Sequence, residues 1–173
     1  MRQQGKTLKM EIILQDSLMH KQFLKRAIKL AEINSRDGKN GPFGAILAKD
    51  GEIIGEGWNQ VVELRDPSAH AEIMAIRQAC AHLDSYSLSG CILYSSCEPC
   101  PMCLATIYWA EIDRLFYACT TEDAEKAGFK DSLVYHQLSL DWNERSITST
   151  QDCRDEGQLI LKKWISNPQK MTY

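Results

Sequence analysis

The order of hydrophobic patterns along the chain predicts an α/β fold in which helices cover both faces of a central sheet. The pattern reads helix, hairpin, helix, strand, helix, strand, helix. The apolar runs that begin at residues 91 and 114 are each followed by a helical pattern, so we expect these two strands to be parallel. With 173 residues, the chain fits one domain that buries roughly two thirds of its unfolded surface without disulfides.

A helix and a hairpin are predicted in the first third of the chain. From Ser17 to Arg36 apolar residues recur at a helical period, with Ser17 as the cap candidate and Gly38 as the stop. Residues 45–49 and 52–57 flank Asp50-Gly51, the two-residue signal of a β-hairpin. Residues 1–15 hold only a short apolar run, which is too short for a signal peptide, and we expect them to form a mobile N-terminal extension.

Three stronger and three weaker elements follow. Residues 66–82 predict a helix whose first turn carries His70 and Glu72, and residues 91–95 predict a buried strand. Pro101 begins a helix that runs to Trp109, because proline is favoured at the first helical position. Residues 114–118 predict another strand, and the weaker helical patterns cover residues 121–127, 132–138 and 156–165.

Charge and cysteine content limit the environment and the partners. The formal net charge is -3, and the basic residues are scattered along the sequence, which weighs against a nucleic-acid substrate. The seven cysteines are an odd number without the spacing of a disulfide framework. No segment approaches the length of a membrane span, so we expect a soluble cytoplasmic protein with no membrane partner.

The residues that carry chemistry are His70-Ala71-Glu72 and Pro99-Cys100-Pro101-Met102-Cys103. Cys100 and Cys103 lie three apart at a helix start and can hold one Zn²⁺ together with His70. Two thiolates and a neutral imidazole cancel the charge of the ion and leave a fourth position for water, whose pKa zinc lowers to about 7. Glu72 is close enough to reach that water without binding the metal, so we assign it as the general base.

Less specific explanations exist for each of these residues. A single Cys-x-x-Cys pair is more often half of a structural zinc site or a redox pair, and the added His-x-Glu is what favours catalysis. Cys97, Cys100 and Cys103 also resemble part of an iron–sulfur run, but Ile107 stands where the fourth cysteine is required. The other histidines and cysteines are expected to be structural.

The two motifs resemble the signature of the zinc-dependent cytidine deaminase superfamily. Within it, the segments 41–45, 66–72, 91–104, 107–110 and 127–132 are most similar to the bacterial guanine deaminases, and the resemblance extends from about Lys21 to Tyr173. It implies a three-layer α/β/α sandwich with a central five-stranded mixed sheet, formed by residues 16–173 as one deaminase domain. It also implies hydrolysis of guanine to xanthine and ammonia, with zinc as cofactor.

The same resemblance implies roles for individual residues. Asp131 is implied to act in catalysis beside Glu72, near the amino group that leaves. Substrate binding is implied for Phe43, Asn59, Ala71, Trp109 and Tyr173. The tail at about 166–173 is implied to close the site, in a homodimer that exchanges this segment between subunits. From the residues alone, Asn59 could serve a turn, Phe43 the core and Asp131 a helix cap, and Tyr173 could be disordered.

Several rival functions share these motifs. Guanosine, cytosine and other amino-heterocycles are alternative substrates, and tRNA adenosine deamination is a further one that the negative net charge disfavours. A non-enzymatic alternative is an interaction module stabilised by a closed zinc site, with Cys97 as the fourth ligand.

Overall fold

The computed structural model describes the backbone of residues 2–172 and the side chains of residues 14–172. The chain divides into two compact units, Met1–Ser132 and Leu133–Tyr173. The first unit holds the sheet and all of the residues that we expect to bind zinc.

A four-stranded mixed sheet forms the centre of the first unit. The strands β1 (Gly44–Lys49), β2 (Glu52–Trp58), β3 (Cys91–Cys97) and β4 (Arg114–Cys119) lie in the order β2-β1-β3-β4. The strand β1 is antiparallel to β2 and to β3, whereas β3 and β4 are parallel. The predicted hairpin and the predicted parallel pair are therefore confirmed.

The five-stranded sheet implied by the resemblance is wrong for the described residues. Among these residues the chain forms helices and irregular segments after β4, and no further strand pairs with it. The hydrophobic pattern itself contained only four strand signals, and residues 121–127 and 132–138 have a helical period instead.

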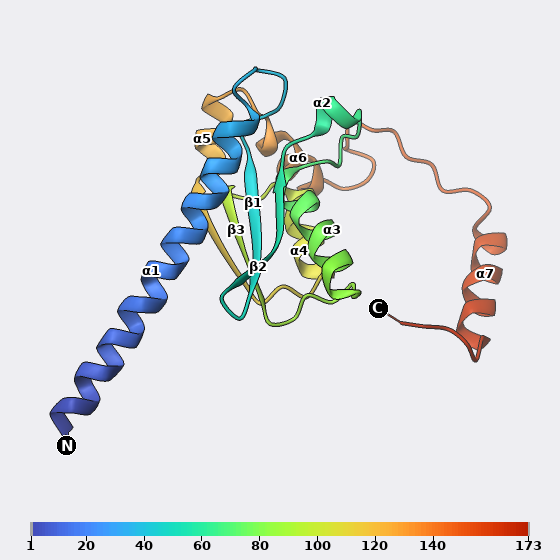
Figure 1. The fold of residues 1–173 in the computed structure, drawn as a ribbon. Helices are drawn as coiled ribbons and strands as arrows, with labels where there is room; N and C mark the ends of the chain where they lie inside the picture. Colours follow the sequence, from blue (N-terminus) through green and yellow to red (C-terminus); the bar gives the residue numbers. More distant parts are fainter. Residues whose placement is uncertain (1, 173) are drawn as a thin grey trace. The chain divides into compact units, whose positions relative to one another are not determined.

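Helices cover both faces of this sheet, as predicted (Figure 1). The alternation of side chains along β1 separates the two cores. Ala45 and Leu47 face the helices α3 (Ala71–Leu83) and α4 (Pro101–Trp109), together with residues such as Ile107. Ile46 and Ala48 face α1 (Arg2–Asn34) on the opposite side, where Tyr94 of β3 is also fully buried.

The helix α3 lies unusually close to β2 because neither surface carries a large side chain. Ala71, Ala75 and Ala79 line one face of α3 and are each 0% exposed. A Cβ atom added at Gly57 would lie 2.2 Å from the carbonyl oxygen of Ala71, and one added at Gly55 would lie 2.4 Å from that of Ala75. Glycine at both positions is therefore what allows this spacing.

The start of α3 differs from the prediction. The helix begins at Ala71 rather than near Asp66, and the short helix α2 (Val61–Leu64) precedes it. The Asp66 carboxylate accepts hydrogen bonds from the Ser68 backbone N–H at 2.8 Å and from its hydroxyl at 2.6 Å. This local turn competes with helix formation and places His70 at the N-cap position.

The remaining helices follow the weaker patterns closely. They are α5 (Thr121–Lys126), α6 (Asp131–Ser139), whose first two residues belong to the first unit, and α7 (Arg154–Ser166) in the second unit. The helix α1 begins at Arg2, well before the predicted start at Ser17. The mobility of residues 1–15 stays a prediction.

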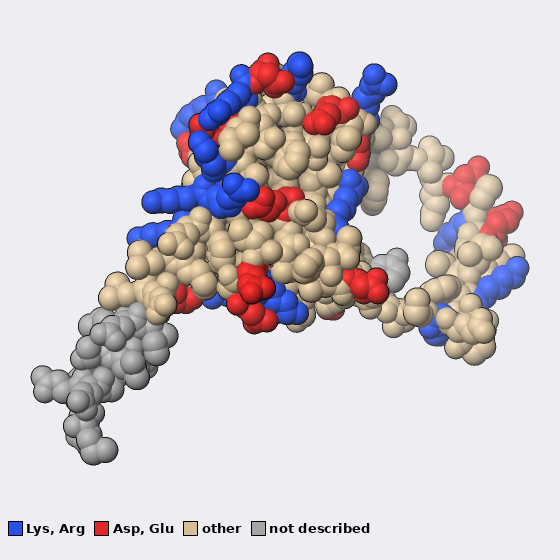
Figure 2. All heavy atoms as spheres, viewed as in Figure 1, with Lys and Arg blue, Asp and Glu red and all other residues tan. Residues whose placement is uncertain are grey.

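On the face drawn in Figure 2, basic side chains gather along α1, and acidic and basic side chains are interspersed over the rest of the first unit. Within the described part of the chain, every helix is too short or too polar to cross a membrane.

Candidate active site

Three predicted ligands converge at the starts of two neighbouring helices. His70 is the N-cap residue of α3, and Cys100 is the N-cap residue of α4, with Pro101 at the first helical position. Cys103 lies one turn further along α4 and is fully buried. The loop geometry that ends β3 and the proline that starts α4 thus bring two sulfur atoms to the imidazole.

The distances within this cluster fit a tetrahedral zinc ion. The Cys100 and Cys103 Sγ atoms lie 3.6 Å apart, and they lie 3.5 and 3.6 Å from His70 Nδ1. Zinc–sulfur bonds of about 2.3 Å and zinc–nitrogen bonds of about 2.1 Å in a tetrahedron require separations of about 3.8 Å between two sulfurs and about 3.6 Å between sulfur and nitrogen. The three donor atoms therefore already have the spacing that the ion requires. Among the described residues, these three side chains form the group that could hold a metal ion.

The electrostatics favour the thiolate form at Cys100 and the thiol form at Cys103. Hydrogen bonding from Cys103, followed by hydrogen bonding to His70, lowers the pKa of Cys100 to about 4. The pKa of Cys103 is raised, first by its hydrogen bond with Cys100 and then by burial. Zinc binding would require both thiols to be deprotonated.

Glu72 lies beside the cluster and is not one of its ligands. Its carboxylate is 6% exposed, accepts a hydrogen bond from Ser95 Oγ at 3.1 Å, and lies 3.5 Å from Cys103 Sγ. Burial raises the pKa of this carboxyl group. A buried carboxyl group with a raised pKa can both accept and return a proton near neutral pH.

A cavity of about 650 Å³ opens onto these groups. Its lining includes His70 and Cys100 from the cluster, Glu72 beside it, and Phe43, Asn59 and Asp131 from the further predicted residues. The structure thus brings three of the weaker predictions to one place, although they come from three separate segments. Their roles in binding or catalysis stay predictions.

Asn59 is buried at the end of β2 and supports the cavity wall. Its Oδ1 accepts hydrogen bonds from the backbone N–H groups of Gly41 and Val61, each at 3.4 Å. With the oxygen used in this way, the amide nitrogen is the group that remains to donate to a substrate. The alternative role of Asn59 in a turn and its predicted role in binding are therefore compatible.

Asp131 is the first residue of α6, where it lies partly buried in the cavity wall. Burial, followed by the negative charge of Cys100, raises the pKa of its carboxyl group. Phe43 packs edge-on against Phe129, with ring centroids 4.6 Å apart. Both aromatic rings line the cavity.

The other predicted binding residues lie elsewhere. Ala71 is fully buried against the sheet, and Trp109 is 70% exposed at the end of α4, outside the lining of this cavity. Tyr173 lies outside the described residues. Cys97 lines the cavity, but it is not in the metal cluster, and its thiol donates to the Thr120 carbonyl at 3.5 Å.

Sequence reasoning assigned no role to several residues of the cavity lining, among them Glu98 and Phe129. Glu98 lies between the motif residues Cys97 and Cys100, and Phe129 lies two positions before Asp131. Both residues lie in segments that resemble the bacterial guanine deaminases, and this resemblance was the signal that the sequence offered. Periodicity and metal spacing do not single out either residue.

Comparison with known proteins agrees with this site. Residues 18–119 match the family model described as the cytidine and deoxycytidylate deaminase zinc-binding region. The chain is 47% identical to the guanine deaminase of Bacillus subtilis over 154 residues, which cover 89% of this chain and 99% of that protein. The solved structure of Bacillus subtilis guanine deaminase superimposes with a TM-score of 0.86, covering 89% of this chain and 98% of the other.

More distant relatives share less of the chain. A solved structure described as guanine deaminase from Nitrosomonas europaea is 34% identical, with a TM-score of 0.60, and covers 63% of each chain. The tRNA-specific adenosine deaminase of Aquifex aeolicus is 43% identical over 96 residues, which cover 56% of this chain and 63% of that protein. The match over residues 18–119, with its His70, Cys100 and Cys103 cluster, shows that the chain belongs to the cytidine and deoxycytidylate deaminase family.

Proposed function

We propose that this chain hydrolyses guanine to xanthine and ammonia, with Zn²⁺ held by His70, Cys100 and Cys103. The observation that carries the proposal is the buried Glu72 carboxylate beside a three-ligand cluster that opens onto a cavity. The 47% identity to Bacillus subtilis guanine deaminase over most of both chains supports guanine as the substrate.

Each group in the cavity has a place in this reaction. When bound, zinc supplies Lewis acidity that makes a water molecule nucleophilic at neutral pH. Glu72 takes a proton from that water and returns it to the substrate, while Asn59 binds the purine and Phe43 packs on its ring. Asp131 assists the leaving amino group, so that one water is consumed and one ammonia is released.

The number of ligands in the cluster favours a catalytic zinc site over a structural one. A structural site requires four protein ligands, whereas the described residues provide three within 4.8 Å of one another. The thiol of Cys97, the remaining candidate for a fourth ligand, donates instead to a backbone carbonyl.

We propose that the C-terminal tail determines the preference for guanine over guanosine. The volume of the cavity is within the range of small-molecule sites and does not by itself exclude a ribose. We propose that residues at about 166–173 close the site over the purine, in a homodimer that exchanges this segment.

The proposed location is the cytoplasm. All seven cysteines are free, which fits a reducing compartment, and both exposed and buried thiols occur among them.

Ammonia release by the zinc-loaded protein tests the function. The substrates are guanine, guanosine, adenine, adenosine, cytosine and cytidine at equal concentrations. We expect guanine to give the highest kcat/KM, with guanosine at least tenfold lower. Deleting residues 166–173 should narrow the difference between guanine and guanosine. Efficient turnover of guanosine or cytosine with little turnover of guanine would contradict the proposal.

A further inference from the structure

The Glu98 carboxylate joins two parts of the site that are distant in sequence. Glu98 lies between β3 and the zinc ligand Cys100, and its Oε2 accepts hydrogen bonds from the backbone N–H and the hydroxyl of Thr121, each at 3.0 Å. Thr121 is the first residue of α5. A charged acceptor with two donors in this geometry is a strong link, since hydrogen bonds to an ionised group are about twice as strong as neutral ones.

Two further contacts join the same segments. The Glu98 backbone N–H donates to the Cys119 carbonyl at 2.9 Å, and the Cys97 thiol donates to the Thr120 carbonyl at 3.5 Å. The loop that leads to Cys100 is therefore attached to residues 119–121 at consecutive positions. Of these contacts, only the side-chain contact of Glu98 can be removed without changing the backbone or the thiol.

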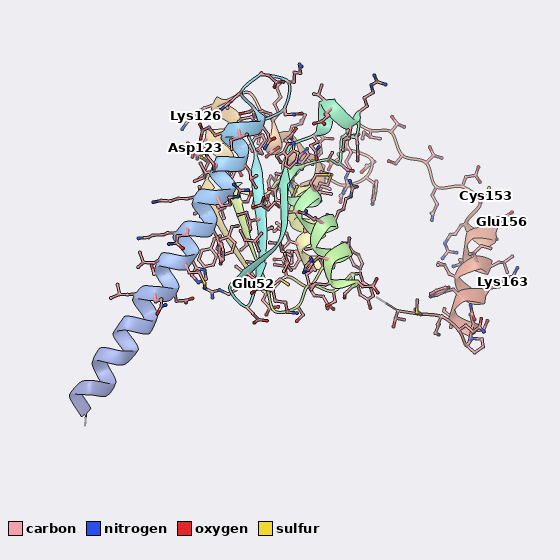
Figure 3. All side chains as sticks on the ribbon, viewed as in Figure 1. Glu52, Asp123, Lys126, Cys153, Glu156 and Lys163 are labelled. Carbon is pink, nitrogen blue, oxygen red and sulfur yellow. The ribbon has the colours of Figure 1, made fainter. Side chains whose placement is uncertain are left out.

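The segment that follows Thr121 leads directly to Asp131. The helix α5, marked by Asp123 and Lys126 in Figure 3, ends in a turn at Gly128, whose φ is +96°. The Phe129 backbone N–H then donates to the Ala124 carbonyl at 3.0 Å, and the Ser132 hydroxyl donates to the Glu125 carboxylate. Residues 120–132 are thus folded back on themselves and form one compact carrier of Asp131.

This carrier is held against the cavity near both of its ends. Glu98 holds its start, and the edge-on contact between Phe129 and Phe43 holds its end. If the Glu98 side-chain contact is lost, the start of the carrier is held only by the Glu98 backbone and Cys97 thiol contacts, and the aromatic contact still holds its end. A displacement of about 1 Å in a catalytic group can cost about a hundredfold in rate.

We propose that Glu98 is a positioning residue that fixes residues 120–132, and through them Asp131, relative to the zinc ligands. The inference rests on the proposed function, because it assigns Asp131 to the departing amino group. Glu98 acts through Thr121 and does not act on guanine itself, although its side chain forms part of the cavity wall.

The variants Glu98→Ala and Glu98→Gln test this role in the full-length zinc-loaded protein. Glu98→Ala should lower kcat for guanine about tenfold to a hundredfold, with KM changed less than about threefold and one zinc retained per chain. Glu98→Gln keeps an acceptor oxygen for Thr121 and should recover most of the lost kcat. The matched control is Glu122→Gln, which removes a charge from the exposed side of α5 and should leave kcat and KM unchanged.

A double-mutant cycle distinguishes action through Asp131 from direct action. Glu98→Ala should cost little further activity when Asp131→Asn is already present, because the two changes then remove the same contribution. Multiplicative losses, a rise in KM that exceeds the fall in kcat, or loss of zinc from Glu98→Ala would each overturn the inference.

Amide hydrogen exchange provides a readout that does not depend on activity. Exchange in residues 120–132 should be faster in Glu98→Ala than in the wild type, while exchange in α3 stays unchanged. If the wild type fails to turn over guanine but this difference is observed, the proposed substrate is wrong and the structural link stands. Unchanged exchange in residues 120–132 would overturn the positioning role even in an active enzyme.

Discussion

Adding one methyl group at Gly57 should weaken both the fold and the zinc site. The new Cβ would lie 2.2 Å from the Ala71 carbonyl oxygen and 2.5 Å from the Ala75 nitrogen, both of which are backbone atoms of α3. Because these distances fall about 1 Å or more short of van der Waals contact, the helix and the strand must separate. Overpacking of this kind costs about 1–3 kcal/mol, which exceeds the roughly 0.4–1 kcal/mol gained by restricting the unfolded chain.

Because of the position of Gly57, its substitution should affect the zinc site as well as the stability of the fold. Ala71 lies between His70 and Glu72, so separation at this point displaces the first turn of α3 and the zinc ligand at its N-cap. Gly55→Ala is the matched control, because its new Cβ would lie 2.4 Å from the Ala75 carbonyl and meet Ala79 one turn further along the same helix. Both variants should therefore be destabilised, but only Gly57→Ala should also lose zinc affinity, by about tenfold or more.

Chemical denaturation of the metal-free proteins measures the loss of stability, and titration against a chromophoric chelator measures the zinc affinity. For a chain of this size, each kcal/mol lost should lower the melting temperature by roughly 2–4 °C. Equal losses of zinc affinity in the two variants, or an unchanged stability of Gly57→Ala, would refute the reasoning.

Three further outcomes are expected. Asn59→Ala should lower kcat/KM for guanine about tenfold to a hundredfold with the zinc content unchanged, because a donor to the purine is lost; retention of full activity would exclude that role. Chelation should abolish ammonia release, and stoichiometric Zn²⁺ should restore it; activity that survives complete metal removal would contradict a zinc-dependent reaction. Burial raises the pKa of the Tyr94 hydroxyl to about 12, so the unfolded state loses this proton first, and stability should fall between about pH 10 and about pH 12. Subtracting the pH dependence of the free energy of unfolding of Tyr94→Phe from that of the wild type isolates the contribution of Tyr94. If the two proteins show the same pH dependence, the loss of stability has another source.

Much of the fold could be predicted because its signals are local. The Asp50-Gly51 turn, the apolar run at 91–95 and Pro101 each determine one element through neighbouring residues, and the structure contains those elements. The start of α3 could not be predicted in this way. The side chain of Asp66 accepts hydrogen bonds from Ser68, and this turn replaces the helical backbone that the apolar pattern alone would favour.

The residues of the candidate site could likewise be predicted only where their signal is local. His70, Cys100 and Cys103 are recognisable from the sequence, since His70 lies at one helix start and the Cys100 and Cys103 pair lies at another. Glu98 and Phe129 act through contacts with Thr121 and Phe43, and such tertiary contacts leave no periodic trace in the sequence. The five-stranded sheet came from the resemblance rather than from the pattern, and it is the part that the described residues contradict.

Glu72→Gln gives the most direct test of the central claim. The substitution keeps the shape and the contact with Ser95 but removes the proton-accepting carboxylate. The variant should fold, retain one zinc per chain and lose at least about a thousandfold in the rate of xanthine formation from guanine. A zinc-loaded Glu72→Gln protein that still forms xanthine at the wild-type rate would contradict the account.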